Sequence, residues 1–382
     1  MDAKSASCFS GFAGPFWHLE DGVLSAIVST YYQEYLRRFV GQFETKLTQS
    51  GGGLVELIDH AATRLGTFET AWHFACAGIR EAVANNVSDD EALDAAVSFA
   101  FHALASGMSG EFHAFSERGF RPMWRDCLIQ QAKSIHVWRR GDEAAIAKDG
   151  SVTSLLPDCC GEGHNFLLTA TSENIHLALL SPEAANIIGC PPPSALAADE
   201  ILLATSNFTA ALDVLERHAP VFARWVGRVL AFIVPVDGPH GLMQSSSSRQ
   251  WPGVAQISFR CDAVAIAEML VHEATHQYFN ILLMLDPVTD GTDRGLYYSP
   301  MRKCERPIEM ILLAYHAFAN VLMFYRECRQ SGLADAGYCE RNERELLPDL
   351  RQLENALMTT KALTEAGEAI WRPFRQYVAQ SV

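Results

Sequence analysis

The stretch that decides the fold is Val254–Phe259, VAQISF, followed by Ala263–Leu285, AVAIAEMLVHEATHQYFNILLML. The alternating apolar residues of the first segment predict a buried strand, and the apolar positions of the second predict a long helix. Asp262 is a favoured residue at a helix N-cap. Asp286-Pro287 predicts the end of the helix, because proline disfavours helical backbone in the residue before it.

The long helix contains His272-Glu273-Ala274-Thr275-His276, a spacing suited to one divalent metal ion. Residues four apart lie one above the other on a helix, so both imidazoles can reach the same ion. Glu273 can face an open coordination position, and we predict that it is catalytic. A strand that leads into such a helix is the arrangement of zincin metalloenzymes. The alternative is two histidines on a partly exposed helix face with a solvated glutamate between them.

A second long helix is predicted from Pro307 to about Cys328, packed on the first, with proline at its first position. Glu309, His316 and Asn320 fall on one stripe of this otherwise apolar helix, and a buried polar stripe is costly unless something pairs with it. Packed helices lie about 8–10 Å apart, so the mid-helix position favours His316 as the third metal ligand. We expect Asn320 and, on the first helix, Asn280 to support the ligands.

Glu309 is the rival third ligand. It lies nearly two turns before His316, about 10 Å along the helix axis, so the two residues cannot easily both bind the ion. Each also has a structural interpretation. Glu309 would then stabilise the start of the helix, and His316 would be a hydrogen-bonded core histidine.

The polar loop from Thr289 to Arg306 carries two arginines and two tyrosines. Arg302 or Arg306 can hold a carboxylate through two parallel hydrogen bonds, as a 2-oxo acid or a peptide terminus would require. We therefore predict that Arg302, Arg306, Tyr297 and Tyr298 bind a cofactor. The alternative is that the arginines are ordinary surface cations.

These residues resemble a family of HExxH-motif proteins that modify ribosomally made peptides. The resemblance covers about Gln244 to Val321, and its main stretches are PGVA at Pro252–Ala255, AEMLVHEATH at Ala267–His276 and YYSPMR at Tyr297–Arg302. The chain departs from the family pattern at Met301, commonly Trp, and at Leu313, often His. The resemblance implies a tailoring enzyme acting on a precursor peptide, and some members resemble iron(II)- and 2-oxoglutarate-dependent hydroxylases.

Two enzymatic functions stay open at this point. In a hydroxylase, two histidines and a third protein ligand leave three positions on iron(II) for 2-oxoglutarate and O2. In a zinc peptidase, Glu273 is the general base, Glu309 completes the zinc site, and the strand Val254–Phe259 holds an extended peptide. A carrier scaffold with structural zinc is disfavoured, because such sites usually have four protein ligands. The resemblance favours the hydroxylase, whereas the motif alone favours the peptidase.

Composition limits the class of protein. The chain has 382 residues, of which 49% are hydrophobic and 20% charged, as in an ordinary globular protein. The net charge is −15 without a basic stripe, which argues against a nucleic-acid partner. The ten cysteines are expected to be reduced core residues. No signal peptide or membrane-spanning run is evident, so we expect a cytoplasmic protein, and the sequence leaves its oligomeric state open.

The expected fold is α+β and predominantly helical. We divide it into a helical region, residues 1–155, with a possible peptide-binding role, and a metal-binding catalytic region, residues 156–382. Further elements are predicted from local patterns. The helices are Leu24–Leu47, Leu54–Leu65, Thr70–Asn85 and Asp89–Ala105; the strands are Ile135–Trp138, His176–Leu180 and Arg228–Val236; and Gly238–Pro252 is a polar loop.

Overall fold

The computed structural model has an α+β fold in which helix predominates, with 58% of residues in helices and 18% in strands, as the sequence predicted. It describes residues 9–67, 71–124, 127–129, 131–148, 151–155, 168–173, 175–190, 194–238, 243–333 and 336–379. Residue 156, where we placed the boundary between two regions, lies outside the described residues.

The first part of the chain is helical only as far as Ala105. Its helices are α2 (Asp21–Ser50), α3 (Leu54–Arg64), α5 (Phe74–Asn85) and α6 (Asp89–Ala105), close to the predicted bounds. Ser88 caps α6 in a capping box with Glu91.

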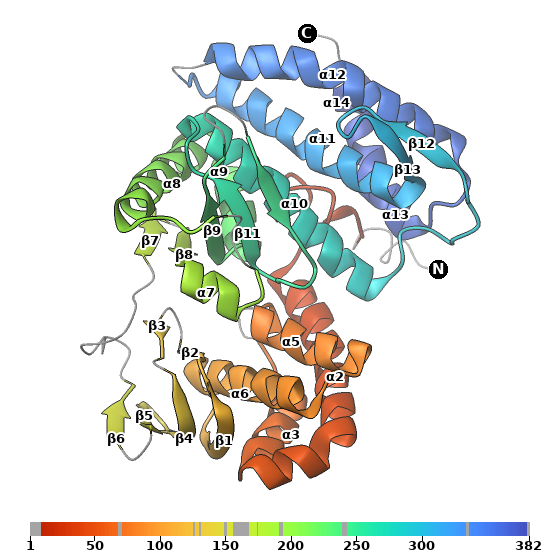
Figure 1. The fold of residues 1–382 in the computed structure, drawn as a ribbon. Helices are drawn as coiled ribbons and strands as arrows, with labels where there is room; N and C mark the ends of the chain where they lie inside the picture. The colour runs from red at the N-terminus through yellow and green to blue at the C-terminus, as the bar shows by residue number, and fades with distance from the viewer. Residues whose placement is uncertain are drawn as a thin grey trace.

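The prediction of a helical region up to residue 155 was wrong, because an antiparallel sheet follows α6 (Figure 1). On its first strand the buried Phe112 and Ala114 alternate with exposed His113 and Phe115, a period of two that only a strand can satisfy. The sheet has the order β1 (Gly110–Phe120), β4 (Ala132–Arg140), β5 (Glu143–Lys148) and β6 (Ser151–Ser154), and a two-stranded ribbon lies beside it, β2 (Met123–Trp124) and β3 (Cys127–Leu128).

A second, five-stranded sheet forms the base of the candidate site. Its three central strands are parallel, and the strand at each edge is antiparallel to its neighbour. Ile233 and Ile257 face the main core, whereas Val234 and Val254 pack towards α7 (Pro182–Ile187) on the other face. The strand order is β10 (Ser245–Ser247), β11 (Val254–Ser258), β9 (Phe232–Val236), β8 (His176–Leu179) and β7 (Leu168–Thr171).

The expectation that the strand at Val254 binds an extended peptide was wrong. This strand, β11, has β10 on one side and β9 on the other, so its backbone groups are already paired. The edge is β10, which lies in the segment predicted as a polar loop. Within the described residues, no strand pairs with the outer side of β10.

Helix α10 spans Ala263–Leu285, the range predicted from the sequence. Its C-cap residue Asp286 is extended, as the following proline requires. Figure 1 shows α10 between the five-stranded sheet and α11 (Ile308–Gln330), which packs on it as predicted.

The remaining elements are α8 (Ala198–His218), α9 (Pro220–Val229), the hairpin β12 (Leu296–Ser299) and β13 (Cys304–Pro307), α12 (Ala336–Thr359), α13 (Glu365–Trp371), a 3₁₀ turn (Arg372–Phe374) and α14 (Arg375–Ala379).

One continuous hydrophobic core joins both ends of the chain. It contains Phe12 and Phe101 from the first part and Ile257 and Phe324 from the second, all fully buried. By length and composition α11 is apolar enough to cross a membrane, and most of it is buried in this core, as in the central helix of a globular fold.

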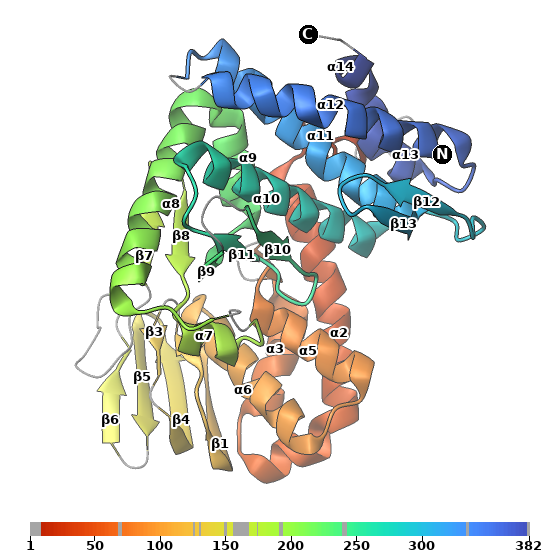
Figure 2. The same cartoon turned by 45° about the horizontal axis from the view of Figure 1, so that its top comes forward.

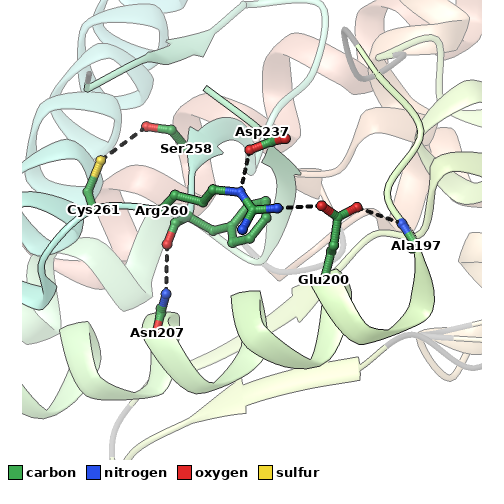
Figure 3. Close-up of polar contacts among 8 residues, drawn as sticks. Ala197, Glu200, Asn207, Asp237, Ser258, Arg260 and Cys261 are labelled. Carbon is green, nitrogen blue, oxygen red and sulfur yellow. Dashed lines mark hydrogen bonds and ion pairs between the residues drawn. The ribbon is translucent and has the colours of Figure 1, made fainter. Parts of the chain in front are cut away.

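The turn between β11 and α10 is held by an ionic network (Figure 3). The Arg260 guanidinium donates to Asp237 after β9, at 2.5 Å, and pairs with Glu200 in the first turn of α8. The Asn207 amide donates to the Phe259 carbonyl at 2.8 Å. These contacts link the start of α10 to the sheet and to α8, and so fix where the helix begins.

Candidate metal centre

The two histidines of α10 and the glutamate between them form one group of potential metal ligands. Ligand atoms of His272, Glu273 and His276 all lie within 4.8 Å of one another. The two imidazoles are half-buried, whereas Glu273 is only 1% exposed. This agrees with helix geometry, because residues 272 and 276 are stacked one turn apart. Among the described residues, this is the one cluster of three or more His, Cys, Asp or Glu side chains that could hold an ion.

Electrostatics keep both imidazoles neutral, which is the form that binds metals. Burial lowers the pKa of His272, with a smaller contribution from the Arg302 charge and an opposing one from Glu273. Burial lowers the pKa of His276 further, and His272, His316, Arg302 and Arg306 add to the effect. The Arg302 charge thus contributes to the lowered pKa of both histidines, and the Arg306 charge to that of His276 alone.

Glu273 is oriented by the edge strand of the sheet. The Ser245 hydroxyl on β10 donates to Oε1 of Glu273 at 2.6 Å. The second oxygen, Oε2, is buried and has no hydrogen-bond partner among the described residues, and the same is true of Nδ1 of His276. Orphaned buried polar atoms are costly, and an ion held by this group, together with water bound to it, would supply partners. The donor set therefore fits a metal ion.

His316 lies outside this group. Its Nε2 donates a hydrogen bond shared by the Ala13 carbonyl at 2.8 Å and the Phe12 carbonyl at 3.0 Å. Burial lowers its pKa to about 4, although the two carbonyls oppose the shift. Its ring is near α10, with its centroid 6.1 Å from that of Phe279. Nδ1, which has no partner among the described residues, is the nitrogen left for a ligand, so the third-ligand role stays a prediction.

The other polar residues predicted on the two helices are spread apart. Asn320 donates to the carbonyls of Ala13 and His316, at 2.8 and 3.1 Å, and so supports the N-terminal segment together with His316. Glu309 is exposed in the first turn of α11 and is not part of the metal group. Asn280 is half-buried one turn after His276.

The predicted cofactor residues lie on the β12–β13 hairpin, which packs on α11 (Figure 2). Arg302 is exposed and Arg306 half-buried, and within the described part of the chain neither guanidinium has an ion pair or hydrogen bond. Tyr297 pairs with Arg306 across the hairpin, but its hydroxyl donates to Asp293 at 2.6 Å. Tyr298 is the next residue along the strand and so faces the opposite side. Of the four predicted cofactor residues, the two arginines are thus the ones available to bind a carboxylate.

Glu268 is a residue near the site that the sequence analysis missed. It lies one turn before His272, on the stripe that continues through His276. Its carboxylate accepts a hydrogen bond from the Tyr338 hydroxyl on α12 at 2.9 Å, and burial raises its pKa to about 6. The spacing of four between Glu268 and His272 is a signal that would have found it.

The arrangement can thus hold a divalent ion, a base or orienting carboxylate beside it, and an anionic ligand near two free arginines. A scan against protein-family models gave no match for this chain, and a search of curated protein sequences gave none either.

Proposed function

We propose that this protein is a metal-dependent enzyme that hydroxylates a side chain of a ribosomally made precursor peptide, using iron(II) and 2-oxoglutarate. The observation that carries the metal-dependent chemistry is the close group of His272, Glu273 and His276, with neutral imidazoles and a buried carboxylate. The resemblance of Gln244–Val321 to peptide-modifying proteins favours the hydroxylase over other metal-dependent reactions.

In this proposal, each residue around the ion has a separate role. His272 and His276 would hold iron(II), which supplies the centre at which 2-oxoglutarate and O2 react. Arg302 or Arg306 binds the distal carboxylate of 2-oxoglutarate, since a guanidinium without a partner matches a carboxylate in both charge and geometry. Glu273, anchored by Ser245, orients a ligand or water beside the histidines.

The peptide substrate lies along β10 in this proposal. An edge strand offers unpaired amide and carbonyl groups to an extended chain. Ser245 belongs to this strand and also contacts Glu273, so a peptide added there passes directly beside the metal group. The protein is then expected to act on an extended segment rather than on a folded domain.

A zinc peptidase is the second candidate, and the buried Glu273 favours it. One carboxylate oxygen has no partner among the described residues and lies beside both histidines, where a general base for water attack would act. The same β10 edge would hold the peptide. Glu273 therefore separates the two candidates experimentally.

The test begins with anaerobic purification and analysis of bound iron and zinc. The iron-loaded protein is then mixed with 2-oxoglutarate and O2, with and without the precursor peptide encoded near its gene. We expect 2-oxoglutarate to lose CO2 and become succinate while the peptide gains 16 Da, with one oxygen atom of O2 in succinate and the other in the peptide. Arg302→Gln and Arg306→Gln are expected to raise the KM for 2-oxoglutarate, by about tenfold or more for the residue that binds it. Arg294→Gln, an exposed arginine before the same hairpin, is the matched control.

Glu273→Gln distinguishes the outcomes. A hydroxylase keeps a measurable fraction of its turnover in this variant, whereas a peptidase loses about a hundred- to ten-thousand-fold or more. Cleavage of the peptide by the zinc-loaded protein without O2, abolished in Glu273→Gln, would replace our proposal by the peptidase. Absence of any bound metal would reject both.

A further inference from the structure

A cavity lies on the far side of α10 from the metal group. It has a volume of about 660 Å³ and is bounded by residues 15–19, helix α9 and Tyr278 of α10. Tyr278 is two residues, or about 200° around the helix, from His276. The cavity is therefore separate from the candidate metal centre and plays no part in the function proposed above.

One face of α9 forms a wall of this cavity. Val221, Arg224, Trp225 and Arg228 all line it, at the spacing of three, four and seven residues that defines a single helix stripe. Arg228 donates to the Leu19 carbonyl at 3.0 Å and so ties the opposite wall to α9. This hydrogen bond holds the two walls of the cavity, α9 and the N-terminal segment, together.

The charge of the lining is opposite to that of the protein. The chain carries a net charge of −15, yet the lining contains Arg224 and Arg228 and no aspartate or glutamate. The exposed Arg224 has no ion pair within the described part of the chain. Two arginines without a carboxylate among the lining residues mark a place that favours an anion.

Aromatic rings supply much of the remaining lining. Phe16 and Trp17 come from the N-terminal segment, and Trp225 stacks on Tyr278 with ring centroids 3.4 Å apart. Trp225 is 4% exposed, and its indole N–H has no acceptor among the described residues, so this wall has an unused donor. Aromatic faces beside arginines bind flat ring systems well.

We infer that this cavity binds a small anion with a planar ring, in which a carboxylate or phosphate meets Arg224 and the ring lies against Phe16 and Trp17. The volume is in the range of small-molecule sites. The arginines supply the charge recognition, and the aromatic residues supply apolar contact that inorganic anions cannot use.

Isothermal titration calorimetry on the full chain tests this inference. The probes are adenosine 5′-monophosphate, indole-3-acetate, uncharged indole and inorganic phosphate. We expect at least one of the two ring-bearing anions to bind, with indole and inorganic phosphate each at least tenfold weaker. Arg224→Gln should weaken the bound anion about tenfold, and Arg224→Lys should restore part of the affinity. Arg64→Gln, an exposed arginine on α3, is the matched control and should bind as the wild type does.

The outcomes decide two questions: which class of anion binds, and whether the site exists. Preference for the nucleotide assigns a phosphate ligand, and preference for indole-3-acetate assigns a carboxylate. Binding that Arg224→Gln leaves unchanged, in a variant whose circular dichroism is native, would overturn the inference. So would no binding of either ring-bearing anion at millimolar concentration, or equal affinity for inorganic phosphate. None of these results depends on bound metal, so they are independent of the hydroxylase proposal.

Discussion

The histidines of α10 and the histidine of α11 lie on two long apolar helices that pack against each other, yet their surroundings differ. His272 and His276 are half-buried and have a carboxylate beside them. His316 is fully buried, and one of its nitrogens already bonds the carbonyls of Phe12 and Ala13. All three are histidines near the middle of a long helix. What distinguishes an available ligand from a histidine that also stabilises the fold is therefore how exposed the ring is and whether its nitrogens already have hydrogen-bond partners.

The largest effect is expected from the α10 histidines. His276→Ala should lower metal affinity about 100-fold or more, because two protein ligands on one helix hold the ion and one is lost. The fold should persist, since α10 keeps its buried apolar residues. Metal stoichiometry after dialysis measures the effect, and His176→Ala, an exposed histidine on β8, should retain the ion. Full occupancy in His276→Ala would remove the distinction between the two helices.

His316→Ala should instead cost stability. It deprives the Phe12 carbonyl of its donor and leaves a cavity, which together should lower the free energy of unfolding by about 2–4 kcal/mol. Urea unfolding measures this, and the exposed His60→Ala should stay within about 0.5 kcal/mol of wild type. An unchanged unfolding midpoint would contradict the structural role.

The metal affinity of His316→Ala tests whether His316 is the third metal ligand. If His316 is a ligand through Nδ1, the affinity of folded His316→Ala falls about as far as in His276→Ala. An affinity equal to that of wild type would reject the ligand role and leave His316 as a core histidine alone.

Glu268 sharpens the comparison. It lies on the same stripe of α10 as His272 and His276, but its carboxylate, like the His316 ring, already has a hydrogen-bond partner. Its folded pKa of about 6 is above its ordinary value of 4.5 because burial disfavours the charged form. The group therefore contributes its full stability below about pH 4.5, and this contribution is lost as pH rises through about 6. Relative to Glu268→Gln, wild-type protein should lose on the order of 2 kcal/mol of unfolding free energy between pH 4 and pH 7. Urea titrations at several pH values measure it, and parallel pH curves would refute it.

The smallest effect concerns Ser245, which connects the edge strand to Glu273. Ser245→Ala removes one hydrogen bond to a buried carboxylate and should cost about 1–3 kcal/mol, near the lower end because part of the residue is accessible to water. Thermal unfolding followed by circular dichroism measures the loss. Ser246 lies next to Ser245 on β10, and Ser246→Ala removes an exposed hydrogen bond to Gln256 of β11, so this variant should change stability by less than about 0.5 kcal/mol. Equal effects of the two variants would show that the contact with Glu273 adds nothing.

Local sequence patterns predicted the elements that contain the metal group but not their long-range partners. The bounds of α10 followed from apolar periodicity and from Asp286-Pro287, both of which act within a few residues. β10 was missed because its three serines show no alternation of apolar and polar residues, and its pairing with β11 is set by the sheet as a whole. The contacts of His316 with Phe12 and Ala13 join segments about three hundred residues apart, which no periodicity encodes.

Those same contacts affect the order in which the chain can fold. Phe12 and Ala13 are separated from His316 by 304 and 303 positions, so a segment synthesised early finds its partners only after most of the polypeptide has left the ribosome. Closing so long a loop is entropically slow, and structures rich in such contacts fold slowly. Until α11 is made, the apolar surface of Phe12 stays exposed to water and to neighbouring chains, a condition that favours aggregation during synthesis. The yield of folded protein should therefore improve when a chaperone shields this segment until α11 has been made.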